Sequence, residues 1–169
     1  GELSGTPTND EVGTFENIII SVSEGGDKVS LAPFSIEVTN TNDVPTVKVP
    51  VLDITILEDN TYTSSDLRTS FGDSDIGDIL MYEVTFANGD ILPSWIQFNS
   101  GVLTVTATSA NLGMHLMKIT ATDGSNEKAV EEFKITVTNV NDAPVGVSDT
   151  ASVDEDSEVL IDVLSNDTD

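Results

Sequence analysis

The sequence contains no cysteine, a single histidine and few aromatic residues. Without cysteine, a disulfide framework and thiol chemistry are excluded. Basic residues are also scarce, six against 30 acidic ones, so the formal net charge is −24 at pH 7. Such a chain is repelled by nucleic-acid phosphates and anionic lipid headgroups and attracts cations. No apolar run approaches the roughly 20 residues that span a bilayer, so we expect neither a nucleic-acid partner nor direct membrane insertion.

Enzyme motifs are lacking as well. The sequence shows no glycine-rich phosphate loop, no Gly-x-Ser-x-Gly motif and no zinc-ligand spacing. The one histidine, His115, stands on an expected strand without a cysteine or serine motif beside it, so we interpret it as structural. Carboxylate pairs of the glycosidase type remain open, but short loops on a small sandwich predict no deep cleft. We therefore expect a protein that is not an enzyme.

What the sequence does have is an internal repeat. The segment from Phe34 to Pro45 recurs from Phe133 to Pro144, an offset of 133 − 34 = 99 residues, with Asn-x-Asn-Asp-x-Pro closing both copies. The spacing of Leu3 and Gly13 recurs 100 residues later, and Glu58-Asp59 recurs 97 residues later as Glu155-Asp156. Repetition at a fixed period indicates a tandem array of one structural unit. The chain, which begins at Gly1 without a signal peptide, is therefore interpreted as a piece of a longer protein.

The repeat divides the chain into three parts. Residues 1–45 form the C-terminal half of one unit, called here the first partial repeat. Residues 46–144 form a complete unit, the central repeat, and residues 145–169 open a third unit, the last partial repeat. Each Asn-Asp-x-Pro closes a strand and starts a short, stiff linker, because proline donates no ladder hydrogen bond. We expect adjacent units to sit end to end.

Alternation of apolar and polar residues predicts β-strands throughout. Phe133, Ile135 and Val137 are predicted to face a core, and Phe34, Ile36 and Val38 are read in the same way. Threonine and valine enrichment and turn-forming separators predict further strands at residues 53–57, 80–86, 95–98, 102–107 and 116–122, with a helical turn near 66–71. Seven short strands in about 100 residues predict an all-β, Greek-key β-sandwich of the Ig-like or cadherin-like kind, in tandem repeats of about 99 residues.

The acidic residues cluster in the loops at the ends of units. Clusters of this kind are usually solvated loop faces. Two features favour a cation site: Asp73 and Asp75 stand at alternate positions, so their oxygens can converge, and Gly77 permits the sharp turn that such a wrap requires. Carboxylates, asparagine amides and backbone carbonyls are the ligands that Ca²⁺ prefers, whereas zinc and copper select nitrogen or sulfur.

Four motifs in order resemble the bacterial dystroglycan-type cadherin-like domain, a relative of the cadherin repeat. They are the runs at residues 73–82, 92–98, 119–124 and 137–144, which read DSDIGDILMY, LPSWIQF, ITATDG and VTNVNDAP. Residues 1–7, GELSGTP, are also typical of this family, so the resemblance covers essentially the whole chain. It implies calcium at the junctions between units. The implied ligands of the first junction are Asn40, Asn42, Asp43, Asp73, Asp75 and Asp123; those of the second are Glu58, Asn139, Asn141 and Asp142, with Asp167 and Asp169 starting the missing half.

The sequence departs from the cadherin pattern in the linkers. Asparagine replaces the linker aspartate at Asn40 and Asn139, the linker is one residue shorter, and no Asp-Arg-Glu element is present, residues 108–110 reading Thr-Ser-Ala. Glu24 occupies the place of Asp123 in the first partial repeat. Fewer charged ligands predict fewer ions per junction and affinities of the micromolar to millimolar class of extracellular modules.

The sequence thus predicts a non-catalytic, calcium-stiffened spacer and adhesion module of a large bacterial surface or secreted protein, located outside the cell. Its expected partners are calcium ions, neighbouring repeats and either another surface protein or a polysaccharide. The alternative is a carbohydrate-binding module, which needs an exposed aromatic platform; we expect Trp95 to lie in the core instead. Both partial repeats leave sheet edges unpaired, so we expect less order there than in the central repeat, unless neighbouring molecules pair.

Overall fold

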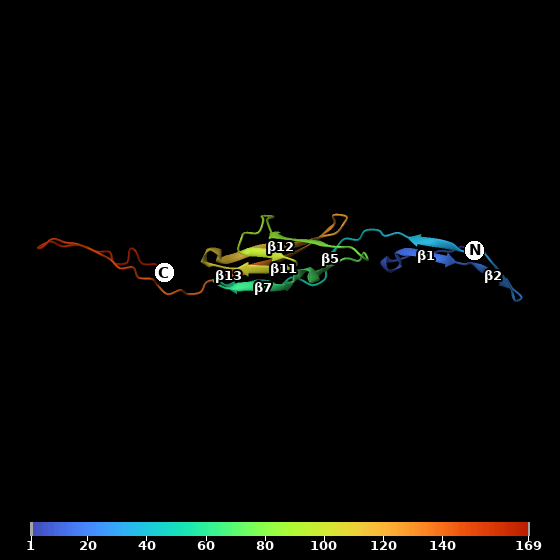
Figure 1. Cartoon of the computed structure of the whole chain (residues 1–169), viewed down its shortest axis with the longest axis horizontal. Helices are drawn as coiled ribbons and strands as arrows, with labels where there is room; N and C mark the ends of the chain where they lie inside the picture. Colours follow the sequence, from blue (N-terminus) through green and yellow to red (C-terminus); the bar gives the residue numbers. More distant parts are fainter. Residues whose placement is uncertain (1, 169) are drawn as a thin grey trace.

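The computed structural model describes residues 2–168, which form an elongated, all-β molecule (Figure 1). The central repeat lies in the middle, and the two partial repeats extend from its opposite ends (Figure 1). Among the described residues, the helical elements are three short 3₁₀ turns: η1 (Asn9–Glu11), η2 (Leu67–Ser70) and η3 (Ser109–Asn111). None of them has the length or the apolar character of a membrane-crossing helix. The predicted helical turn near residues 66–71 is confirmed as η2.

The central repeat is a sandwich of two sheets. The first sheet has the order β6 (Ile54–Leu57), β13 (Lys128–Thr138), β12 (Gly113–Thr122), β9 (Met81–Phe86). The second has the order β10 (Ile96–Asn99), β11 (Val102–Thr106), β7 (Thr61–Asp66). All pairings are antiparallel except β13 with β6, which is parallel. A short pair, β5 (Thr46–Val47) with β8 (Phe71–Gly72), closes one end.

The core of the central repeat follows from the predicted alternation. Phe133, Ile135 and Val137 of β13 are buried, as predicted, and so are Leu103 and Val105 of β11 on the facing sheet. The predicted strands differ from the observed ones by a few residues at their ends, β12 starting three residues earlier than expected. Strand β7 was missed because its sequence, TYTSSD, is almost entirely polar, so apolar alternation gave no signal there.

The first partial repeat contains paired strands without a core. Strand β1 (Gly13–Ile18) pairs with β4 (Phe34–Val38), and β2 (Ser21–Glu24) pairs with β3 (Asp27–Ser30). The prediction that Phe34, Ile36 and Val38 face a core is wrong in this structure: Phe34 and Ile36 remain 36% and 38% exposed, and Val38 is half-buried. The alternation is correct, but no second sheet covers this two-stranded one among the described residues.

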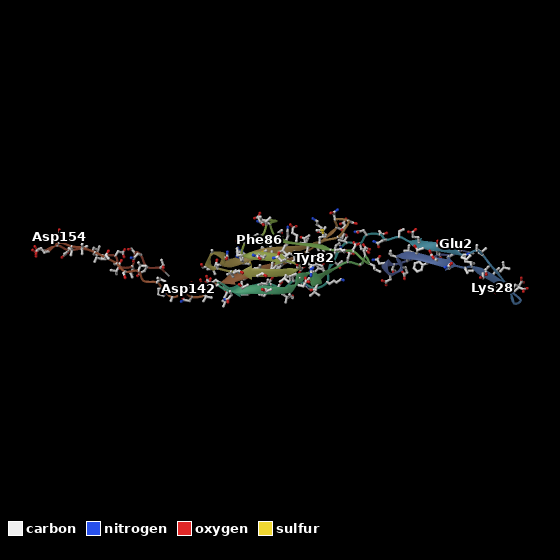
Figure 2. All side chains as sticks on the ribbon, in the orientation of Figure 1. Glu2, Lys28, Tyr82, Phe86, Asp142 and Asp154 are labelled. Atoms are coloured by element: carbon white, nitrogen blue, oxygen red, sulfur yellow. The ribbon has the colours of Figure 1, made fainter. Side chains whose placement is uncertain are left out.

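The last partial repeat is an extended excursion. It leaves the central repeat after Asp142, reaches its tip near Asp154, and returns so that Val145 and Thr168 form an isolated antiparallel bridge (Figure 2). Strands of the regular kind are absent from residues 145–168. We expected less order in both partial repeats than in the central repeat. The last partial repeat has no regular strand among its described residues, whereas the first partial repeat does form strands.

Candidate metal centre

The first junction gathers three carboxylates from two segments far apart in sequence. Asp73 and Asp78 lie in the loop that follows β8, and Asp123 follows the last residue of β12. One carboxylate oxygen from each of the three lies within 4.8 Å of the other two. That separation allows three anionic oxygens to face a single cation.

The loop carrying Asp73 and Asp78 is shaped by local hydrogen bonds. Asp73 Oδ1 accepts a bond from the backbone N–H of Asp75 at 2.9 Å, which turns the chain at once. Gly77 then adopts φ +95°, a conformation that side chains other than glycine rarely take. This turn brings Asp78 back toward Asp73, so that the short loop supplies two of the three clustered carboxylates.

The linker between the first partial repeat and the central repeat enters the same site. The side-chain amide of Asn42 donates to Asp123 Oδ2 at 2.9 Å, and the backbone N–H of Asp43 donates to Asp75 Oδ2 at 2.7 Å. The amide of Asn9 in turn donates to Asp43 Oδ2 at 2.6 Å. The site is therefore built from both sides of the junction.

Buried carboxylate oxygens without hydrogen-bond partners mark where a cation fits. Asp75 is only 5% exposed, and its Oδ1 has no partner among the described residues; Asp73 Oδ2 is likewise buried and unpartnered. A buried carboxylate oxygen is costly unless a donor or a cation compensates it. The donor set is made of oxygen alone, which suits Ca²⁺. The residues at this junction could therefore hold a metal ion.

Proton affinities at the site reflect the same crowding. The hydrogen bond from the Asn42 amide, together with backbone N–H donors at Glu127, Ser125 and Asn126, holds the pKa of Asp123 below its ordinary value. Partial desolvation, followed by repulsion from Asp75, Asp73 and Asp123, raises the pKa of Asp78. The raised pKa of Asp78 means that its charged form is disfavoured beside the other three carboxylates when no cation is present.

At the second junction, Glu58 is the one implied ligand that is buried among the described residues. Glu58 is 1% exposed; its Oε1 accepts the backbone N–H of Val140 at 2.7 Å, while its Oε2 is buried and has no partner among residues 2–168. Asn141 and Asp142 are exposed, and among residues 2–168 the Asn141 amide bonds only to the Asp142 carbonyl, at 3.0 Å. Asp167 Oδ1 accepts the Val147 N–H at 2.8 Å, and Asp169 lies outside the described residues.

Of the ten residues implied by the resemblance, the structure therefore brings five together at the first junction. These are Asn42, Asp43, Asp73, Asp75 and Asp123. Asn40 and Asn139 are exposed and form no side-chain hydrogen bond within the described part of the chain. Asp78 was not among the predicted ligands, although it lies in the motif at residues 73–82. The glycine before it was the available signal, since a turn at Gly77 returns the next side chain to the cluster.

The aromatic residues form no open platform at Trp95. Its side chain is half-buried, packs against the core, and meets the His115 ring edge-on with centroids 5.0 Å apart. His115 Nε2 lies 2.8 Å from the carbonyl oxygen of Asn111. Trp95 thus covers the edge of the core, and the structural interpretation of His115 agrees with its packing.

The two sheets, their parallel β6–β13 edge and the acidic end loop define an all-β sandwich module of the cadherin-like and Ig-like type. Residues 44–138 match the family described as Putative Ig domain (He_PIG), and the chain belongs to that family. No curated protein sequence matches the chain.

Solved structures of cadherin repeats share this fold. The alignment with human mucin-like protocadherin EC1-2 covers 82% of this chain and 74% of the protocadherin chain, at 19% identity and a TM-score of 0.60. The alignment with the protocadherin GammaB4 extracellular domain covers 88% of this chain and 25% of the protocadherin chain, at 23% identity and a TM-score of 0.60. An endo-fucoidan hydrolase from glycoside hydrolase family 107 also aligns, at 23% identity and a TM-score of 0.46; the chain spans 22% of its length. Similarity at these identities shows the fold alone.

Proposed function

We propose that this chain is a calcium-binding, non-catalytic spacer and adhesion module, and that calcium stiffens the junctions between its repeats. The observation that carries the proposal is the pair of buried, unpartnered oxygens, Asp75 Oδ1 and Asp73 Oδ2, beside a linker that bonds to the same loop. The dystroglycan-type cadherin-like resemblance supports it, as does the fold shared with protocadherin repeats. In keeping with that resemblance, we place the parent protein on a bacterial surface or among secreted proteins.

The proposed mechanism is electrostatic. Asp73, Asp75, Asp78 and Asp123 repel one another when no cation is present, by about 1–4 kcal/mol per close pair at effective dielectric constants of 80 to 20. A bound calcium ion supplies the compensating positive charge. Asn42 and Asp43 of the linker already bond to Asp123 and Asp75. A cation that holds these carboxylates in place therefore also holds the linker in place. The first partial repeat then stops hinging against the central repeat.

Glu58 extends the proposal to the second junction. Its oriented Oε1 and unpartnered Oε2 offer half of a site at the end of the central repeat opposite β5 and β8. A tandem array would therefore carry one cation site at each end of every unit. With fewer charged ligands than cadherins, each site is expected to hold calcium in the micromolar to millimolar range.

The test is a thermal melt of the chain in excess chelator and then across a calcium series, with sodium chloride of equal ionic strength as the reference. Binding to the native state raises the melting temperature with ligand concentration. Small-angle scattering of the same samples reports whether the particle becomes more extended and less flexible.

Two double variants give this experiment its control. Asp73→Ala with Asp75→Ala should abolish the calcium response of both the melt and the scattering profile. Glu83→Ala with Glu132→Ala removes the same charge from exposed strand positions and should leave both responses intact. A melting temperature indifferent to calcium in the unmodified chain would reduce the function to that of a generic sandwich spacer.

A further inference from the structure

Hydrogen bonds from uncharged donors connect the first partial repeat with the central repeat at the first junction. The Asn9 amide of the first partial repeat donates to Asp43 Oδ2 of the linker at 2.6 Å. The backbone N–H of Asp43 then donates to Asp75 Oδ2 at 2.7 Å. Beside it, the Asn42 amide donates to Asp123 Oδ2 at 2.9 Å. A continuous path of hydrogen bonds therefore runs from one repeat through the linker to the next.

The donor at the upstream end of this path is held by its own repeat. The backbone N–H and the hydroxyl of Thr8 both donate to Glu11 Oε2, at 2.6 and 2.7 Å, and close the turn η1. Reciprocal contacts of this kind fix the start of a helical turn. Asn9 is the first residue of η1, so this turn fixes the backbone from which the Asn9 amide reaches the linker.

The acceptors at the downstream end are held by the central repeat. Thr46 pairs with Gly72 in the β5–β8 ladder, which sets the end of the linker beside the start of the acidic loop. Asp123 Oδ1 accepts two backbone N–H groups of its own loop, at 2.8 and 2.9 Å. Because those bonds occupy Oδ1, Asp123 presents Oδ2 to the linker. Each end of the path is therefore fixed within its own repeat.

The linker itself orients the Asn42 amide. Asn42 Nδ2 also donates to the carbonyl oxygen of Asp43 at 3.1 Å. In the next linker, 141 − 42 = 99 residues later, Asn141 Nδ2 donates in the same way to the carbonyl oxygen of Asp142 at 3.0 Å. The arrangement is therefore a local property of the Asn-Asp step. An amide nitrogen carries two hydrogens, so one serves the linker and the other reaches Asp123.

An amide suits this position when the carboxylates carry no bound cation. A hydrogen bond to a charged acceptor is shorter and roughly twice as strong as one between neutral groups. Asn42 supplies such a bond and adds no negative charge to the cluster of Asp73, Asp78 and Asp123. A carboxylate in the same place would face Asp123 and repel it. The resemblance implies that Asn42 is a calcium ligand, but here its amide nitrogen donates to protein oxygens.

We propose that Asn9 and Asn42 form an amide latch, which holds the two repeats together at the first junction before calcium binds. Calcium then tightens a junction that the latch has already brought together. The inference rests on the proposed function for the calcium step alone, because the latch acts in the absence of calcium. A latched junction keeps the carboxylates near one another at low calcium. The ion then meets a largely preorganised site, which lowers the ordering cost of binding.

Pulsed electron paramagnetic resonance in excess chelator tests the latch. The sequence has no cysteine, so Thr14→Cys on β1 and Gln97→Cys on β10, both exposed, place one spin label in each repeat. The unmodified linker should give a defined main distance in chelator. Asn42→Ala and Asn9→Ala should each lose that main distance and give a broad distribution. A distribution that is unchanged in Asn42→Ala, or already broad with the unmodified linker, would overturn the latch.

A matched control lies in the next linker. Asn141→Ala removes the same amide and the same bond to the following carbonyl, but at the second junction, so it should leave the distance distribution unchanged. Asn42→Asp replaces the donor with a charge, so in chelator it should broaden the distribution at least as much as alanine does. Equal broadening by Asn141→Ala, or a sharp distribution for Asn42→Asp in chelator, would contradict the assignment.

Adding calcium to the same samples separates this inference from the proposed function. Calcium should narrow the distribution further with the unmodified linker and restore a main distance in Asn42→Asp, whose carboxylate can also bind the ion. If calcium narrows the distribution but Asn42→Ala matches the unmodified linker in chelator, the latch alone fails. If Asn42→Ala differs in chelator but calcium changes nothing, the proposed function fails and the latch stands.

Discussion

The side-chain amide of Asn42 donates a hydrogen bond to Asp123 Oδ2 across 2.9 Å, joining residues 81 positions apart. This bond connects the linker with the loop after β12, whereas the next linker residue, Asp43, bonds through its backbone N–H to Asp75. A polar side chain of the linker thus already holds one of the proposed ligands.

Asp78→Asn should have opposite effects in chelator and in calcium. In chelator the substitution removes the carboxylate whose pKa is raised by desolvation and by Asp75, Asp73 and Asp123, so the melting temperature should rise by a few degrees. In calcium it removes a ligand of the cluster, so the stabilisation by calcium should shrink. Melting curves under both conditions check this. If Asp78→Asn melted identically to the unmodified chain in both, Asp78 would have no part in the site.

Substitutions at Glu58 should distinguish the roles of its two carboxylate oxygens. Glu58→Gln keeps an acceptor for the Val140 N–H but removes the charge, so it should leave stability in chelator unchanged or higher and weaken the calcium response. Glu58→Ala also removes the acceptor of that bond and should cost about 1–3 kcal/mol of unfolding free energy even in chelator. Urea unfolding of both variants gives the comparison. Equal losses for glutamine and alanine would refute the separate roles.

Isoleucines at equivalent positions of successive repeats should contribute differently to the free energy of unfolding. Ile135→Ala removes a fully buried side chain from the core of the central repeat and should cost about 2–5 kcal/mol. Ile36→Ala, 99 positions earlier and 38% exposed, should cost less than about 1 kcal/mol in the monomer. Chemical unfolding of the two variants measures both losses. A comparable loss at Ile36 would mean that the first partial repeat has a core of its own.

Gly101→Ala should destabilise the turn between β10 and β11. Gly101 adopts φ +88°, and a Cβ there would collide with the side chains of Asp66 and Arg68. The strained backbone is expected to cost about 1–3 kcal/mol, and the Asp66–Arg68 pair must also move. The matched control is Gly124→Ala, because Gly124 is exposed and a Cβ there meets nothing. Thermal unfolding of the two variants would contradict the assignment if their losses were equal.

Asp66 should give the chain an acid-dependent contribution to stability. Its side chain bonds to the Arg68 guanidinium at 2.6 Å and to the Arg68 N–H, and both bonds lower its pKa. A lowered folded-state pKa means stability that is fully present above the unfolded value of about 3.9 and is lost as pH falls through the folded one. The melting temperature of Asp66→Asn should therefore be lower than that of the unmodified chain at neutral pH, and the two melting temperatures should converge in acid. A gap that persisted at the lowest pH would point to packing and not to charge.

Local sequence was sufficient for most strands of the central repeat and for most of the acidic motif. The alternation at Phe133, Ile135 and Val137 predicts both the strand and its buried face, because successive strand residues point to opposite sides. Local sequence was not sufficient for β7, whose inward positions are largely polar, nor for the exposure of Ile36, which the alternation had predicted to face a core. Burial depends on whether a second sheet is present, and the same alternation appears with or without one.

The sequence by itself determined the repeat, the all-β sandwich and the acidic loops at the ends of its units, because strand alternation, turn residues and motif spacing are local properties. Only the tertiary structure decided which acids converge. It brought Asp78 into the cluster with Asp73 and Asp123, left Asn40 and Asn139 outside, and isolated Glu58 with one unpartnered oxygen. The reason is physical: convergence depends on which loops the pairing of distant strands carries to the same end of the sandwich, and no spacing within one segment contains that information.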